Sequence, residues 1–156
     1  MQIGIIGHGV VGSAISFGFS KLGHVVKVHD VKLDTRIKDV MDTEIVYVCV
    51  PTKALPDGQC DTSIVEEVVE QLCQCYGYEG VIAVKSTVIP GTTDKLIKQY
   101  PGYRICSVPE FLRERCAIAD FTEHHDLCVV GTVRDICFDR VVESHGRYPK
   151  KFMQLK

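Results

Sequence analysis

The sequence predicts an α/β fold in which a doubly wound, mainly parallel sheet carries helices on both of its faces. Two observations predict this class. Short, largely apolar runs alternate along the 156 residues with stretches whose apolar positions repeat at helical spacing, as in parallel strands joined by right-handed helical crossovers. The first apolar run also ends in a glycine-rich turn, directly before a predicted helix.

The first thirty residues predict a dinucleotide site. An apolar strand from Ile3 to Ile6 runs into Gly7-His8-Gly9-Val10-Val11-Gly12, and a helix of small residues follows. In this Rossmann-like arrangement the first glycine permits a tight turn, the second lets the backbone approach a pyrophosphate, and the third lets helix and strand pack closely. A second strand ends at Asp30, 18 residues after Gly12, near the usual offset of a carboxylate that binds an adenosine ribose. Because an acid there would repel a 2′-phosphate, we expect NAD rather than NADP. Taken alone, the turn could also be an ordinary glycine-rich connection.

The next elements continue the alternation. The run from Glu44 to Val50 predicts a third strand that is buried on both faces and ended by Pro51, which has no amide hydrogen for a strand ladder. A helix is predicted from Thr62 to about Tyr76, and Ser63 with Glu66 has the spacing of a capping box. The remaining expected elements are the strands Val81 to Val84, Tyr103 to Cys106 and Leu127 to Val130, the helices Gly91 to Gln99 and Arg134 to Ser144, and a closing strand around Phe152 and Met153.

Composition limits the class of protein. With 46% hydrophobic and 24% charged residues and a net charge of −2, the chain has neither the basic surface of a nucleic-acid binder nor the composition of a disordered segment. The N-terminus enters the first strand without an export signal, and no apolar run approaches the roughly 20 residues of a membrane span. We therefore expect residues 1–156 to form a single cytoplasmic domain.

The eight cysteines predict neither a disulfide framework nor a zinc site. Cys49, Cys106 and Cys128 lie in apolar runs, where cysteine behaves as a small hydrophobic side chain. No two cysteines have the C-x2-C spacing of zinc ligands, and His124-His125 has no spaced thiol partner. We expect reduced cysteines, solvent-exposed histidines at these two positions, and no metal.

Function is expected in the segments that follow the strands, because ligands of doubly wound sheets lie across the carboxyl ends of the strands. Three such segments collect hydroxyl, acidic and basic side chains: Pro51 to Lys53, Lys85 to Thr93, and Val108 to Glu114. Each has a purely structural alternative. Ser86 or Thr87 could simply turn the chain, for example, and Thr92 could cap a helix.

Together these segments resemble the N-terminal domain of the UDP-glucose/GDP-mannose dehydrogenase family. The matching motifs are Gly7 to Gly12, Val50-Pro51-Thr52, Lys85-Ser86-Thr87-Val88, Pro90-Gly91-Thr92-Thr93, Ala117-Ile118, Asp120-Phe121 and, as the most specific, Pro109-Glu110-Phe111-Leu112-Arg113-Glu114. The resemblance covers nearly the whole chain. It implies an NAD-dependent enzyme that oxidises the 6-hydroxyl of a nucleotide sugar, most simply UDP-glucose, twice to a carboxylate through a cysteine-bound thiohemiacetal and thioester.

The resemblance also implies roles for individual residues. Thr87 would lie beside the reacting centre and help to position a water molecule, and Glu110 matches a glutamate implicated in thioester hydrolysis, where a carboxylate orients or deprotonates water. Glu114 would lie near the nicotinamide. On a looser alignment, Arg36 would lie near the adenosine phosphates. The other implied cofactor residues are Gly7, Gly9, Val10, Val11, Gly12, Asp30, Val50, Pro51, Thr52 and Ser86. The strip implied to bind the sugar nucleotide through its backbone is Glu110, Phe111, Leu112, Arg113 and Glu114.

Several positions depart from the family pattern. Val108 replaces an asparagine, Arg115 a glycine and Leu127 an arginine, and the stretch from Val31 to Glu44 is much shorter than in family members. None of the eight cysteines lies in the G-G-x-C-x-x-K-D context of the family nucleophile. We therefore expect that the family's central helix and C-terminal cysteine domain are absent, and that the chain cannot complete the two-step oxidation alone.

Three functions remain open. The sequence favours the NAD-binding portion of a nucleotide-sugar dehydrogenase, either a fragment or a compact form whose catalytic half is a separate chain. The second is a non-catalytic NAD-binding module for sensing or docking. The third is a small dehydrogenase related to the hydroxyacid enzymes, although those rely on a lysine in a later helical domain. Because family members pair through the central helix, we expect a monomer.

Overall fold

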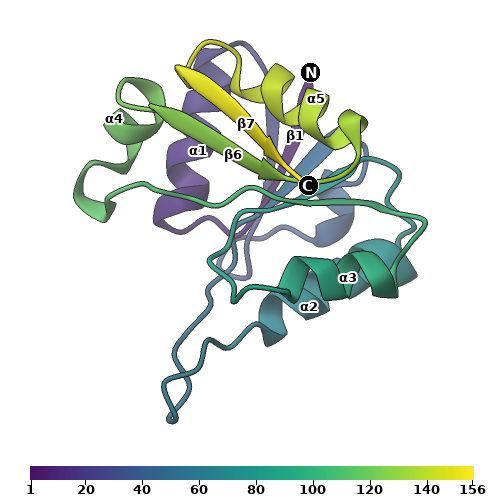
Figure 1. Cartoon of the computed structure of the whole chain (residues 1–156). Helices are drawn as coiled ribbons and strands as arrows, with labels where there is room; N and C mark the ends of the chain where they lie inside the picture. Colours follow the sequence, from purple (N-terminus) through teal and green to yellow (C-terminus); the bar gives the residue numbers. More distant parts are fainter.

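The strands form one seven-stranded sheet in the order β2-β1-β3-β4-β5-β6-β7 (Figure 1). This computed structural model describes all residues from 1 to 156. Strands β2, β1, β3, β4 and β5 are parallel, whereas β6 runs antiparallel to β5 and parallel to β7. The elements are β1 (Gln2–Ile6), α1 (Val10–Lys21), β2 (Val25–His29), η1 (Ile37–Val40), β3 (Ile45–Val48), α2 (Ser63–Glu70), η2 (Gln71–Cys75), β4 (Val81–Val84), α3 (Thr92–Gln99), β5 (Arg104–Ser107), η3 (Glu114–Cys116), α4 (Ala117–Thr122), β6 (Leu127–Gly131), α5 (Asp135–His145) and β7 (Lys151–Leu155). The predicted fold class is confirmed.

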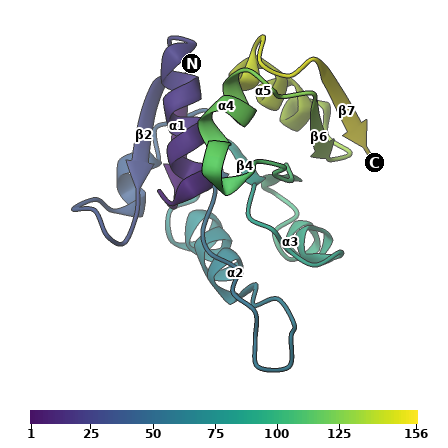
Figure 2. The ribbon, with the colours of Figure 1, turned by 90° about the vertical axis from the view of Figure 1, so that its left-hand side faces the viewer.

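A hydrophobic core lies on each side of the sheet. Helices α2 and α3 cover one face together with the 3-10 turn η1, and α1, α4 and α5 cover the other (Figure 2). The side chains of β3 show the alternation, since Val46 and Val48 enter the first core and Ile45 and Tyr47 the second. Burial on both faces is the reason why this strand is a continuous apolar run in the sequence. None of the helices is long and apolar enough to cross a bilayer.

Helix α1 packs against α4 through a glycine. The ring of Phe121 in α4 is fully buried, and a Cβ at Gly18 would lie 2.4 Å from its Cδ1 atom. The ring of Phe19 meets Phe121 edge-on, with 5.3 Å between the ring centroids. The hydroxyl of Tyr148 donates a hydrogen bond to the carbonyl oxygen of Gly18 at 2.9 Å. Gly18 therefore sets the distance between the two helices.

The sheet ends at β2, where a doubly wound dinucleotide fold usually carries one more strand. The connection from Val31 to Glu44 contains only η1 before the chain enters β3. A crossover between parallel strands takes a dozen or more residues, so a connection of this length has no room for both a crossover and an additional strand. This agrees with the shortness of the segment noted in the sequence.

Local details of the second long helix differ from the prediction. The α-helix ends at Glu70, and the π-helical turn η2 continues it to Cys75. The predicted capping box of Ser63 with Glu66 is wrong, because Ser63 is already the first helical residue and its amide donates to Asp61 Oδ1 at 3.0 Å. The hydroxyl of Thr62, the N-cap residue, bonds Glu66 instead.

We expect Gly18→Ala to lower the free energy of unfolding by about 1–2 kcal/mol. The new methyl group would overlap the Phe121 ring, and such overpacking typically costs about 1–3 kcal/mol, partly offset by the better helix propensity of alanine, about 0.5–1 kcal/mol. Urea denaturation followed by circular dichroism measures the difference. Gly102→Ala is the matched control, since a Cβ there meets nothing within 4 Å. Equal stability of the two variants would contradict the packing argument.

Candidate dinucleotide and substrate site

The turn between β1 and α1 is crowded at two of its glycines and open at the third. Gly7 has a φ angle of +95°, and a Cβ there would lie 2.6 Å from the carbonyl oxygen of Cys49. A Cβ at Gly12 would lie 1.9 Å from the carbonyl oxygen of Gly7. At Gly9 a Cβ would meet nothing within 4 Å. The backbone is therefore packed tightly below the turn and accessible at Gly9, which is the shape that a pyrophosphate cradle requires.

The first turn of α1 is suited to an anion. Gly9 is the N-cap residue, no side chain caps the helix, and the first turn contains no acid. The amides of Val10, Val11 and Gly12 belong to the first turn, where helical amides have no intrahelical acceptor. Their positive partial charge favours a negatively charged ligand at this point.

Asp30 follows β2 and reaches the glycine turn. Its Oδ2 accepts a hydrogen bond from the amide of His8 at 2.6 Å, and its Oδ1 accepts one from the amide of Lys32 at 2.8 Å. These bonds, that from His8 first, lower the pKa of Asp30 and favour the ionised form. Each carboxylate oxygen retains a lone pair, so the group can still accept bonds from ribose hydroxyls. Arg36 is exposed at the start of η1, and its guanidinium has no acidic partner.

The loops after β3 and β4 are joined through Ser86. Its hydroxyl lies 2.8 Å from the carbonyl oxygen of Val50 and 3.2 Å from that of Val48, and it donates to these oxygens. Val50 is buried, Pro51 is exposed and Thr52 is half-buried. The side chain of Thr87 is exposed, and its carbonyl oxygen accepts a bond from the thiol of Cys60. Ser86 thus holds the loops in place, while the Thr87 hydroxyl is free for a ligand.

An ion pair between Lys85 and Glu110 is buried behind these loops. Lys85 Nζ lies 2.7 Å from Glu110 Oε2, and the two side chains are 2% and 8% exposed. Glu110 Oε1 accepts a hydrogen bond from the amide of Phe111 at 2.8 Å. Lys85 was not among the predicted site residues. The sequence signal was a lysine placed directly after a fully buried strand, where a charge needs a partner.

The strip from Glu110 to Glu114 is anchored by Asp120. The backbone amide, Nε and Nη2 of Arg113 all donate to this carboxylate, at 2.9, 3.0 and 2.7 Å. The bonds from Arg113 hold the pKa of Asp120 well below its usual range. The Arg113 side chain is therefore a structural anchor. Phe111 is exposed, and Leu112 packs against the core.

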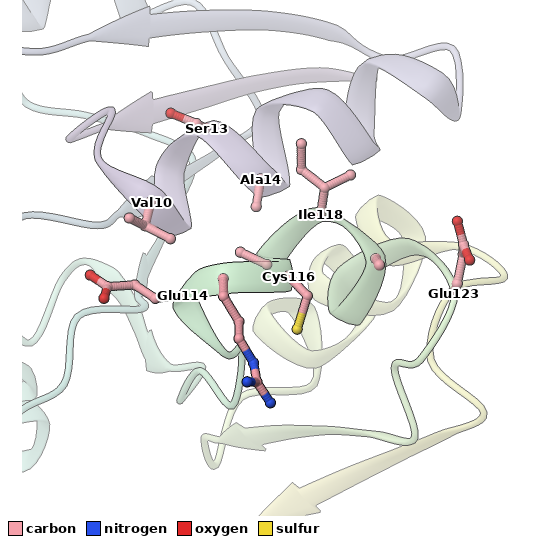
Figure 3. A pocket seen from close by; sticks show the side chains of 10 residues that line it. Val10, Ser13, Ala14, Glu114, Cys116, Ile118 and Glu123 are labelled. Carbon is pink, nitrogen blue, oxygen red and sulfur yellow. The ribbon is translucent and has the colours of Figure 1, made fainter.

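A cleft of about 460 Å³ lies between the start of α1 and the segment that contains η3 and α4 (Figure 3). Val10 and Glu114 face each other at one end, and Glu123 lies at the other. The cleft also contains Arg115, the residue that replaces a family glycine. Val10 at the end of the glycine turn and Glu114 at the end of the Glu110–Glu114 strip both line this cleft.

The expectation that His124 and His125 are both exposed is wrong for His125. His124 is exposed, but His125 is half-buried, with its ring centroid 5.4 Å from that of Phe121 and 5.7 Å from that of His145. Its Nδ1 atom is enclosed by protein. Packing of the loop against α4 and α5 buries this ring, and the sequence of the loop does not show such a contact.

Comparison with known proteins decides the family. Residues 30–146 match the NAD binding domain of the UDP-glucose/GDP-mannose dehydrogenase family. The chain belongs to this family. The matched region begins at Asp30, and the glycine turn that precedes it has the geometry described above. The domain that the chain matches is the one that binds NAD in this family, and the open cradle at Gly9 with the carboxylate of Asp30 fits that cofactor.

The relatives of the chain are longer proteins. UDP-glucose 6-dehydrogenase AglM of Haloferax volcanii is 26% identical over 92% of this chain and 44% of its own length. UDP-glucose 6-dehydrogenase of Rickettsia bellii is 27% identical over 84% of this chain and 39% of its own length. Among solved structures, a UDP-glucose dehydrogenase from Pyrobaculum islandicum superposes with a TM-score of 0.86 at 24% identity, over 99% of this chain and 46% of that one. The chain thus spans less than half the length of these relatives.

We expect Asp120→Asn to lower the melting temperature at pH 7, and the difference to begin shrinking only below about pH 4. The folded-state pKa of Asp120 lies well below the unfolded value, which is about 3.9, so its contribution to stability is fully present above that value and is lost as the pH falls to the folded pKa. Thermal melts at pH 7, 5, 3 and 2 measure the effect. Asp126→Asn is the matched control, because its pair with Lys150 is exposed on both sides. Equal melting temperatures of the wild type and Asp120→Asn at pH 7 would contradict this assignment.

Proposed function

We propose that residues 1–156 form the NAD-binding unit of a nucleotide-sugar 6-dehydrogenase, with UDP-glucose as the simplest substrate. The observation that carries this proposal is the meeting of three features at the carboxyl ends of the strands. These are the open turn at Gly9, the carboxylate of Asp30, and the Glu110–Glu114 strip across the cleft from α1.

NAD would lie with its pyrophosphate at the turn and its ribose hydroxyls at Asp30. The amides of the first turn of α1 would hold the phosphates, and Glu114 with Val10 would line the nicotinamide end. Val50, Pro51, Thr52 and Ser86 would form the side of the site, and the exposed Arg36 would reach the adenosine phosphates. Bound there, NAD supplies the acceptor for a hydride from the sugar.

The nucleotide sugar would contact the backbone of the Glu110–Glu114 strip. Thr87, with its free hydroxyl, would help to hold a water molecule, and Glu110 would orient that water or remove its proton. The carboxylate lies 2.7 Å from Lys85 Nζ, which holds it in position. The thiol nucleophile and the remaining catalytic groups would come from a catalytic half, either a separate chain or further sequence.

One observation favours the second candidate function, a non-catalytic NAD-binding module. The thiol that lines the cleft belongs to Cys116, and it lies 3.6 Å from Asp120 Oδ2, to which it donates. Cys116 is the only cysteine that lines the cleft, and its thiol proton is bonded to a carboxylate of the fold.

We expect the chain to bind NAD in isothermal titration calorimetry and Asp30→Ala to weaken binding roughly 10- to 100-fold. Loss of hydrogen bonds to a charged group costs about 1.5–3 kcal/mol, and about 1.4 kcal/mol is tenfold in affinity. The wild type should bind NADP more weakly than NAD. The ratio of the two affinities should be smaller in Asp30→Ala. Asp34→Ala, an exposed acid on the same loop, should bind as the wild type does. Equal NAD affinity of the wild type and Asp30→Ala would contradict the proposed site.

We also propose that residues 1–156, purified by themselves, are monomeric, because none of the elements of these residues is the central helix through which the family pairs. Size-exclusion chromatography with light scattering should give a mass near 17.4 kDa. A tight dimer at micromolar concentration would contradict this proposal.

A further inference from the structure

His8 occupies the turn between β1 and α1, with Gly7 before it and Gly9 after it. Because both neighbours are glycines, His8 carries the only side chain between the end of β1 and the start of α1. The residue is exposed, although the strand residues from Ile3 to Ile6 are buried. The resemblance to the family assigned no role to this side chain.

The backbone of His8 is fixed from two directions. Its amide donates to Asp30 Oδ2 after β2 at 2.6 Å, and its carbonyl oxygen accepts a hydrogen bond from Ser13 Oγ of α1 at 3.2 Å. The imidazole ring itself takes part in no hydrogen bond or ion pair within the protein. A ring that has no protein partner and is carried by a fixed backbone is available to a ligand.

The space next to this ring is the expected pyrophosphate site. A Cβ at Gly9 would meet nothing within 4 Å, so the volume beside His8 is open. The first turn of α1 contains no acid and has no side-chain cap. A phosphate held by the first-turn amides lies within reach of the His8 side chain, because Gly9 is the only residue between them. A protonated imidazole can give such a phosphate a charge-assisted hydrogen bond.

Three charged groups lie around the turn. Asp30 accepts the amide of His8, Lys32 follows on the same loop, and Glu114 faces Val10 across the cleft (Figure 3). Hydrogen bonds from the amides of His8 and Lys32 lower the pKa of Asp30, and the charges of Lys32 and His8 lower it further. Asp30 is therefore ionised throughout the range from pH 5.5 to 8.5.

A second histidine, His29, lies at the end of β2. It is half-buried, and its Nδ1 atom lies 3.1 Å from Thr35 Oγ1. Carboxylates and lysines normally titrate outside the range from pH 5.5 to 8.5, whereas histidine changes its charge within it. Of the two histidines beside the turn, only His8 has an exposed ring without a protein partner.

We propose that His8 is a cofactor-binding residue whose protonated ring donates a hydrogen bond to the pyrophosphate of NAD. This rests on the proposed function, in which the pyrophosphate lies at the glycine turn. A proton on His8 and NAD then favour each other's binding, because such coupling is reciprocal. NAD binding is therefore tighter on the acid side of neutrality, and the chain takes up protons as it binds the cofactor.

The size of the effect follows from the interaction of two opposite charges. An opposite charge within about 4–6 Å shifts the pKa of an ionisable group by about 1–3 units, and one unit corresponds to a tenfold change in affinity. The turn is open to solvent, which screens charges, so the lower end of this range applies. We expect NAD to bind up to about tenfold more tightly at pH 5.5 than at pH 8.5.

Isothermal titration calorimetry of NAD into the purified chain at pH 5.5 and 8.5 tests the proposal. The wild type should show the roughly tenfold ratio of affinities. In His8→Gln, which keeps a polar side chain without the titrating ring, this ratio should be close to one. His124→Gln is the matched control, because it removes an exposed histidine from the loop before β6, and it should keep the wild-type ratio. A ratio of one in the wild type, or a wild-type ratio in His8→Gln, would overturn the role of His8.

Nuclear magnetic resonance of the histidine rings separates this role from the proposed function. The signal of His8 is identified by its loss in His8→Gln, and NAD should raise its titration midpoint. Sulfate, a dianion over the whole pH range, is a second probe that needs no dinucleotide, and it should raise the same midpoint without moving that of His124. NAD binding without a change at His8 rejects the role of His8 alone. A rise caused by sulfate without NAD binding rejects the proposed function alone, and the absence of both effects rejects both.

Discussion

The close approach of α1 to the end of β1 is the constraint on which the site depends. Gly12 lets the helix begin against the carbonyl oxygen of Gly7, and Gly7 itself turns next to Cys49 with a positive φ angle. The helix can then direct its first-turn amides at the space above the carboxyl ends of the strands. A side chain at either position would push the helix away and close the space that Gly9 leaves open.

The buried pair of Lys85 and Glu110 stabilises the region of the candidate site. It joins the segments that follow β4 and β5, which are neighbouring strands in the sheet. Removing one partner of a buried pair typically costs about 3–5 kcal/mol, because the other charge stays unpaired. The pair therefore restrains the strip that begins at Glu110. The bonds from Arg113 to Asp120 restrain the other end of the strip.

The elements that the sequence predicted well are those with a strong local pattern. The strands β1, β3 and β4 are apolar runs buried on both faces, and α1 follows a turn in which Gly7 and Gly12 leave no room for a Cβ. Helix α4 was not predicted, because its six residues are too few for a helical repeat to show. Its position depends on the contact of Phe121 with Gly18, more than one hundred residues earlier. Spacing alone could not decide whether Thr62 or Ser63 is the N-cap residue of α2, because both carry a hydroxyl group.

The sequence by itself determined the alternation of strands and helices, the glycine turn with its carboxylate at Asp30, and the family motifs. These depend on backbone conformation and on patterns of neighbouring residues, which local chemistry controls. Only the tertiary structure decided that Lys85 meets Glu110 and that the rings of His125 and His145 pack together. Such contacts join residues far apart in the chain, and the packing of helices on both faces of the sheet, rather than any local preference, sets the distances between them.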